Sequence, residues 1–193
     1  MSDTILWYAT RGAGVVSLVL LTGVVVLGIA SAMRWQTASW PRFLTTGLHR
    51  NLALATLIFL AIHVVTAVVD PFTALGWQAA VIPFSSPYRR LWAGLGVVAI
   101  DLLLAIVVTS LLRPLFGHHA WRIIHWLTYL MWPVAVIHSI GTGTDPRFAW
   151  MLAIEAVCIG SVVAAVTWRV SGVPHGAWRQ VPAAVRPPAQ KWS

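Results

Sequence analysis

The sequence predicts an all-α integral membrane protein, a bundle of about five transmembrane helices with its N-terminus outside and its C-terminus in the cytoplasm. Of the 193 residues, 59% are hydrophobic and only 9% are charged, and the mean hydropathy is +0.79. Soluble domains carry about 25% charged residues. Lipid is therefore the expected solvent for most of the chain, and membrane lipid is an expected partner.

Five apolar runs have the length that a membrane span needs. A helix crosses about 30 Å of hydrocarbon with roughly 20 residues, and the runs cover 12–33, 48–69, 91–112, 121–140 and 148–170. We interpret residues 1–170 as one transmembrane domain. Residues 171–193 are basic, rich in Pro and too short to bury a core, so we expect a disordered cytoplasmic tail.

Each pair of runs is separated by residues that break helices. These breaks are Pro41, the pair Asp70-Pro71, the stretch 83–87, Pro114 with Gly117, and the stretch 141–146.

The net charge of +8 is explained by membrane topology, because the basic residues lie at the ends of apolar runs. A nucleic-acid surface would need a continuous basic patch, so no nucleic-acid partner is expected. With five spans, four basic residues fall on the side of the N-terminus and nine on the other. The positive-inside rule places the side with nine in the cytoplasm and predicts a multi-pass protein of the cell membrane.

A cleaved signal peptide and a cysteine-based site are weaker interpretations than a membrane bundle. Ala30-Ser31-Ala32 resembles a signal-peptide cleavage site, but the preceding run is long for a signal peptide, and cleavage would leave Arg34 on the translocated side. Cys158 is the single cysteine, so one chain cannot build a disulfide framework or a cysteine metal site.

Four histidines lie in two of the runs at matched spacing. His49 and His63 are fourteen residues apart in the second run, and His125 and His138 are thirteen apart in the fourth. At 1.5 Å per residue each pair spans about 20 Å along its helix. Both runs cross in the same direction, so His49 matches His125 in depth and His63 matches His138.

This arrangement is typical of two stacked b-type haems. A six-coordinate haem iron takes one axial imidazole from each of two facing helices, and the sequence supplies such a pair twice. We therefore predict an inner haem held by His49 and His125 and an outer haem held by His63 and His138. Electrons would pass from one leaflet to the other.

Helical phase puts His49 and His63 on one face of their helix, but regular α-helical phase does not do so for His125 and His138. At about 100° per residue, two side chains that are fourteen residues apart differ in direction around the helix axis by about 40°, and two that are thirteen apart differ by about 140°. Pro133 lies between His125 and His138 and removes the hydrogen bond to the carbonyl of Tyr129. The fourth span is therefore expected to be distorted near Pro133.

Two roles without haem are also open to the four histidines. One is interhelical hydrogen bonding, and the other is metal or proton handling by the membrane protein. Ionisable groups in membrane spans are costly and indicate function by default, and two depth-matched pairs favour haem over either alternative.

The stretches "GLHRNLALATLIFLAIH" and "WRIIHWLTYLMWPVAVIH" carry these histidines. Their spacing resembles that of the ferric reductase-like transmembrane domain, which NADPH oxidases share, over about residues 12–170. The resemblance implies a bis-haem membrane cytochrome that moves electrons from a cytoplasmic donor to an outer acceptor. It implies iron and haem binding by His49, His63, His125 and His138.

Fused members of that family continue into FAD- and NADPH-binding domains. This chain has a short basic tail there and no glycine-rich nucleotide loop. Flavin or nicotinamide chemistry is therefore expected only through a separate redox partner, a flavoprotein or a quinol donor. The chain is an oxidoreductase component or a non-catalytic haem-bearing subunit of a flavoprotein or an exported reductase. The acceptor (ferric iron, oxygen, a quinone or a protein), the oligomeric state and enzymatic activity in isolation stay open.

Several polar residues have candidate roles around these haems. Arg50 and Arg122 flank the inner histidines and are candidates for contact with haem propionates, as is Arg42. Ordinary cytoplasmic anchoring is the alternative for all three.

Asp101 in the third span and Glu155 in the fifth are candidates for hydrogen bonds to the second nitrogen of a ligand histidine. A structural interhelical bond is the alternative for Asp101. We expect the remaining histidines, His118, His119 and His175, to be solvated residues of a loop and the tail.

Overall fold

The computed structural model describes residues 2–37, 39–71, 73, 75–142 and 149–171, and the regular elements within these ranges are all helices. The prediction of an all-α protein is confirmed. The helices are α1 (Ser2–Ala32), α2 (Arg42–Val69), α3 (Gly76–Val81), α4 (Arg90–Leu111), α5 (Arg113–His125), α6 (Thr128–Thr142) and α7 (Ala149–Val170).

Five segments are long and apolar enough to cross a membrane, as predicted, so the chain is a multi-pass membrane protein. They are Thr4–Ala32, Arg42–Val69, Arg90–Leu111, Gly117–Thr142 and Ala149–Val170. α1 and α2 begin several residues before the predicted apolar runs, because helical hydrogen bonding continues into the flanking polar residues at little cost.

Two local features were not predicted. α3 is a short helix within the expected loop between the second and third spans. Only Leu112 separates α4 from α5, and the chain then turns at Gly117, where φ is +72° and ψ is 162°. Glycine adopts this conformation without the clash that a Cβ would cause.

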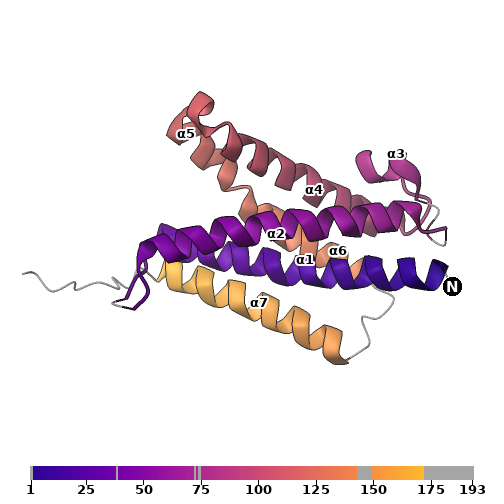
Figure 1. Ribbon diagram of the computed structural model, residues 1–193, viewed down its shortest axis with the longest axis horizontal. Coiled ribbons are helices and arrows are strands. Elements are labelled where there is room, and N and C mark those ends of the chain that lie inside the picture. The colour runs from indigo at the N-terminus through magenta and orange to yellow at the C-terminus, as the bar shows by residue number, and fades with distance from the viewer. Residues whose placement is uncertain (1, 38, 72, 74, 143–148, 172–193) are drawn as a thin grey trace, which may run out of the picture.

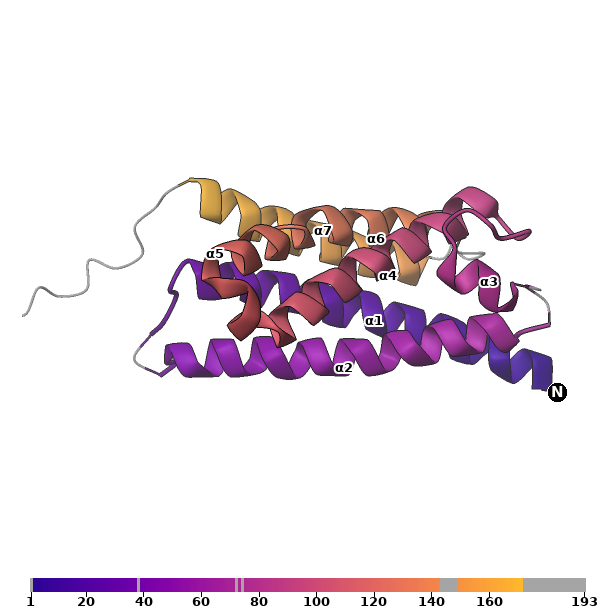
Figure 2. The ribbon, with the colours of Figure 1, turned by 90° about the horizontal axis from the view of Figure 1, so that it is seen from above.

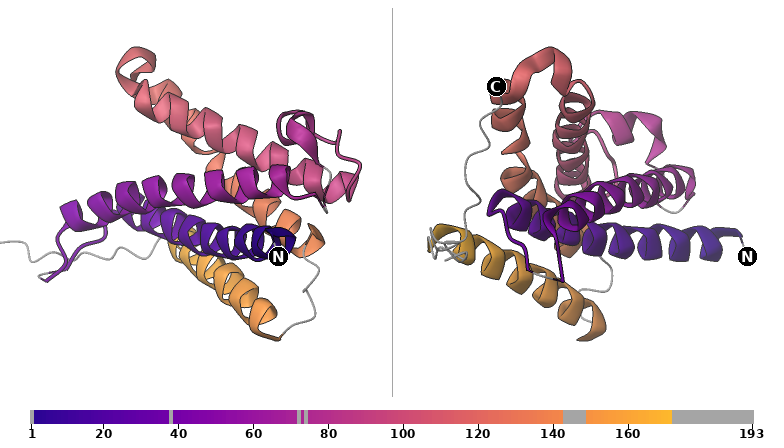
Figure 3. Two further views of the ribbon diagram at one scale, coloured as in Figure 1. Left: turned by 45° about the vertical axis from the view of Figure 1, so that its right-hand side comes forward. Right: turned by 60° about the vertical axis from the view of Figure 1, so that its left-hand side comes forward.

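α1 is the central helix of the bundle. It lies between α2 and α7 and also contacts α6, while α4 packs on α6 (Figures 1 and 3). The N-terminus and α3 lie at one end of the bundle and α5 lies at the other, as the view from above also shows (Figure 2). α2 packs mainly along α1 and buries only Thr45 and Thr56 fully.

The core lies where α1, α4, α6 and α7 meet, and it is built from aliphatic side chains around one indole. Its buried members include Leu18, Val25, Ile29, Trp132, Val136 and Val162. The Trp132 indole N–H donates to the Thr22 hydroxyl at 3.1 Å, and that hydroxyl donates to the Leu18 carbonyl at 2.8 Å. The first bond joins α6 to α1 inside the apolar core, and the second holds the Thr22 hydroxyl in place within α1.

The Thr22→Val variant tests this link. It keeps the volume of the side chain but leaves the Trp132 N–H unpaired, and we expect a loss of about 1–2 kcal/mol in the free energy of unfolding. Thr167→Val is the control, because the Thr167 hydroxyl is exposed and bonds only carbonyls of its own helix. Unfolding in mixed detergent–SDS micelles measures both, and equal losses would contradict a special role for Thr22.

Candidate functional site

The four histidines of the second and fourth spans form two facing pairs. His49 and His125 have ring centres 6.3 Å apart with planes inclined by 61°, and His63 and His138 have ring centres 6.3 Å apart with planes inclined by 78°. α2 supplies one ring of each pair. The end of α5 and the middle of α6 supply the other two.

The spacing of each pair fits one metal ion between the rings. Bonds of about 2.0 Å to nitrogens that lie about 1.2 Å from their ring centres put the centres of two opposed imidazoles about 6.4 Å apart, close to the observed 6.3 Å. The same arithmetic leaves at least about 3.9 Å between nitrogens of the two rings, too far for a hydrogen bond. Direct bonding between the paired histidines is therefore excluded.

The donor set fits haem better than a bare ion. Within the described ranges, no three His, Cys, Asp or Glu side chains come together to hold a metal ion. Two imidazoles alone leave the coordination of a transition metal incomplete. A porphyrin supplies the remaining ligands in one plane and leaves both axial positions for imidazoles.

Three of the four rings are oriented by carbonyls of neighbouring helices. Nδ1 of His49 lies 2.9 Å from the Val24 carbonyl, Nδ1 of His63 lies 2.8 Å from the Thr10 carbonyl, and Nδ1 of His138 lies 2.8 Å from the Trp92 carbonyl. A carbonyl only accepts, so each Nδ1 carries the proton and donates it. Nε2 is then the nitrogen with a free lone pair.

Each of these carbonyls is followed four residues later by a glycine that contacts the same ring. A Cβ at Gly28 would lie 3.3 Å from His49, one at Gly14 would lie 3.0 Å from His63, and one at Gly96 would lie 2.6 Å from His138. The missing side chains let the imidazoles approach the helix backbone. This pattern of a carbonyl and a glycine four residues apart was not predicted, although both positions are visible in the sequence.

His125 is held differently. Its Nδ1 is buried and has no hydrogen-bond partner among the described residues. Instead the ring packs on Trp121, with ring centres 5.0 Å apart and an angle of 32° between the planes.

The chain from Ile124 to Leu130, at the junction of α5 and α6, is wound more tightly than an α-helix. Leu127, Tyr129 and Leu130 each donate their backbone N–H to the carbonyl three residues earlier, at 2.9 to 3.0 Å. Three residues per turn add about 20° per residue relative to an α-helix, so about five such residues reduce the predicted phase error from about 140° to about 40°. The tight winding turns both rings toward α2.

The distortion expected near Pro133 lies in the turns just before it. Trp126 and Leu127 fall between α5 and α6, whereas Pro133 lies inside α6. Pro133 removes the hydrogen bond to Tyr129, and Tyr129 belongs to the tightly wound stretch. The chain has therefore adjusted in the turns before the proline.

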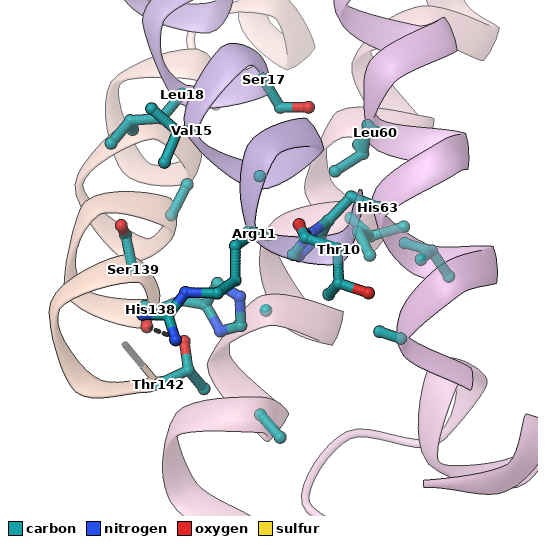
Figure 4. Close-up of a pocket in the computed structure, with 18 of the residues that line it drawn as sticks. Thr10, Arg11, Val15, Ser17, Leu18, Leu60, His63, His138, Ser139 and Thr142 are labelled. Atoms are coloured by element: carbon teal, nitrogen blue, oxygen red, sulfur yellow. Dashed lines mark hydrogen bonds between the residues drawn. The ribbon is translucent and has the colours of Figure 1, made fainter. Parts of the chain in front are cut away.

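A cavity of about 900 Å³ opens beside the second pair. His63 and His138 both line it, and Figure 4 shows them on facing helices with Thr10 next to His63. Thr10 and Ser17 also line the cavity, and their buried hydroxyls have no hydrogen-bond partner among the described residues. The volume of the cavity is within the range of cofactor sites.

The expected role of the two acidic residues was wrong. Carbonyls, not carboxylates, bind the second nitrogen of His49, His63 and His138. Glu155 is buried and accepts a hydrogen bond from the Ser139 hydroxyl at 3.1 Å, and Asp101 is exposed on α4. A backbone carbonyl accepts the histidine proton without a second ionisable group in the membrane span, whereas a carboxylate partner would add one.

The remaining candidates lie outside the two pairs. Arg42, Arg50 and Arg122 are exposed. His118 and His119 are exposed, as expected for solvated residues, but they belong to α5 and not to a loop. His175 lies outside the described residues.

Comparison with known proteins identifies one family. Residues 13–136 match the family described as the ferric reductase like transmembrane component. No curated protein and no solved structure matches the chain.

The three glycines provide a graded test of the ring positions. Gly96→Ala should displace the His138 ring most, Gly14→Ala should disturb His63 less, and Gly28→Ala should disturb His49 least, because the contacts lengthen in that order. Haem content per chain and the absorption spectrum measure the effect. Gly160→Ala is the control, since a Cβ there meets nothing within 4 Å. A loss as large in the control as in Gly96→Ala would contradict the importance of the ring contacts.

Proposed function

Because this chain belongs to the family of ferric reductase-like transmembrane components, we propose that it is a bis-haem b cytochrome that carries electrons across the cell membrane. The observation that supports this best is the 6.3 Å spacing of both histidine pairs, which suits one iron between each pair. His49 and His125 hold the inner haem, and His63 and His138 hold the outer haem. When bound, each haem supplies an iron that accepts and releases one electron at a time.

The chain's own residues orient and tune the ligands. The Nδ1 proton of His49, His63 and His138 goes to a backbone carbonyl, which keeps the ring in one tautomer and raises the basicity of Nε2. Arg50 and Arg122 are the candidates to contact the inner propionates, since each neighbours an inner ligand on its helix.

The distribution of basic residues supports an orientation in the membrane. The end of the bundle with α5 faces the cytoplasm under the positive-inside rule, and residues 171–193 form a cytoplasmic tail. Electrons reach the inner haem from a separate flavoprotein or quinol donor and leave the outer haem toward an acceptor on the other side.

Haem stoichiometry tests the proposal. We expect two haems per chain with bis-imidazole spectra in the reduced-minus-oxidised difference, because each pair supplies both axial ligands. His63→Ala and His125→Ala should each lose one haem of the two. His119→Ala should lose none, since His119 belongs to neither pair. A wild-type protein that is colourless after haem-sufficient expression, or full retention in both ligand variants, would overturn the assignment.

A further inference from the structure

A row of aromatic rings leads from the inner histidine pair to the surface. Trp121 packs on His125 with ring centres 5.0 Å apart, and His118 packs on Trp121 with ring centres 5.4 Å apart and an angle of 34°. His118 is exposed, whereas Trp121 and His125 are partly buried. The three rings therefore connect the protein surface to the residue that the proposed function makes a ligand of the inner haem.

The outer two rings are fixed by polar contacts. The Trp121 indole N–H donates to the Ser110 hydroxyl at 3.1 Å. The Arg113 guanidinium lies 4.5 Å from the centre of the Trp121 ring and donates to Nδ1 of His118 at 3.1 Å. Gly117 makes the turn that brings His118 back over Trp121. These contacts hold the stacked rings of His118 and Trp121 in place at the corner between α4 and α5.

The surface around His118 combines positive charge with an exposed apolar side chain. Arg113, His119 and Arg122 are exposed there, and Leu115 is 79% exposed. Leu115 lies between the two segments that could cross the membrane, Arg90–Leu111 and Gly117–Thr142. Arginine and an apolar anchor around an aromatic centre are typical of protein–protein contact sites.

The charges at this end have one sign. The described carboxylate side chains are Asp70, Asp101 and Glu155, and none lies at the corner: Asp70 ends α2 at the opposite end, Asp101 is in mid-α4 and Glu155 is in α7. A partner that meets this surface gains by presenting acidic groups, which also speed its diffusional encounter.

We infer that the α4–α5 corner is the docking surface of a soluble electron-donor protein with an acidic rim around its redox centre, and that His118 and Trp121 are its contact route to the inner haem. This inference rests on the proposed function. In the proposed electron transfer, one electron would leave the reduced donor and convert the inner ferric haem to ferrous haem. No bond forms or breaks, and no proton is transferred. The rings act by filling the gap between donor and haem with packed π-systems, because electron tunnelling weakens steeply across unfilled space.

The test compares two neighbouring histidines in the haem-loaded protein in nanodiscs. The donor probe is reduced flavodoxin, a small acidic flavoprotein, and stopped-flow absorbance follows haem reduction. We expect His118→Leu to slow reduction about tenfold, His118→Phe to keep most of the rate because it retains a ring, and His119→Leu to change it less than about twofold. His119 is a matched control, since it is exposed in the same turn and has no ring contact with Trp121.

Three further measurements separate the possible failures. Haem content and the rate with dithionite, a small reductant, should be equal in all variants, and the affinity of oxidised flavodoxin should fall in Arg113→Glu and with added salt. Equal effects of the His118 and His119 substitutions, or a flavodoxin rate independent of salt, would overturn the docking inference while leaving haem binding intact. A rate that follows anionic lipid content and ignores His118 would assign the corner to lipid headgroups and also overturn it. Absence of haem from the wild type would instead defeat the proposed function.

Discussion

The carbonyl oxygen of a helical residue has a second lone pair that its own helix leaves unused, and three imidazoles of this protein bind there. The Val24, Thr10 and Trp92 carbonyls receive the Nδ1 protons of His49, His63 and His138. Each bond fixes a ring in a single tautomer and a single orientation inside the membrane span. The rest of the architecture provides the access and the spacing that these three bonds require.

Small residues give the imidazoles access to the carbonyls, and helix packing sets the spacing between the paired rings. Glycines one helical turn after each carbonyl leave room for a flat ring against the backbone. α1 contacts both α2 and α6, so the two histidine-bearing spans share a neighbour, and their paired rings still face each other. Tight winding ahead of α6 then turns His125 and His138 to a common face, which a regular helix with that spacing does not achieve.

Much of the fold was predictable, because hydropathy and breaker residues report directly on membrane spans. The five spans and the pairing partners of the histidines follow from run length, direction and rise per residue. The sequence could not identify what orients the rings, because every residue type has a backbone carbonyl. The glycine four residues after each accepting carbonyl is the one sequence feature that goes with it. Asp101 and Glu155 were attractive ligand partners on chemical grounds, but their helical phase and depth place them elsewhere. The distortion near Pro133 was predicted, but its exact place in the preceding turns was not, because a proline shows which hydrogen bond is lost and not where the chain absorbs the change.

The carbonyls that anchor the histidines divide the molecule into two hairpins. Both rings of α2 are anchored on α1, and His138 of α6 is anchored on α4. Both anchors of α2 therefore lie within the first half of the chain and need no contact with the helices that follow. The anchor of His138 likewise lies within the second half. The two histidine pairs form only where the two halves meet, so their geometry reports directly on how the halves are packed together.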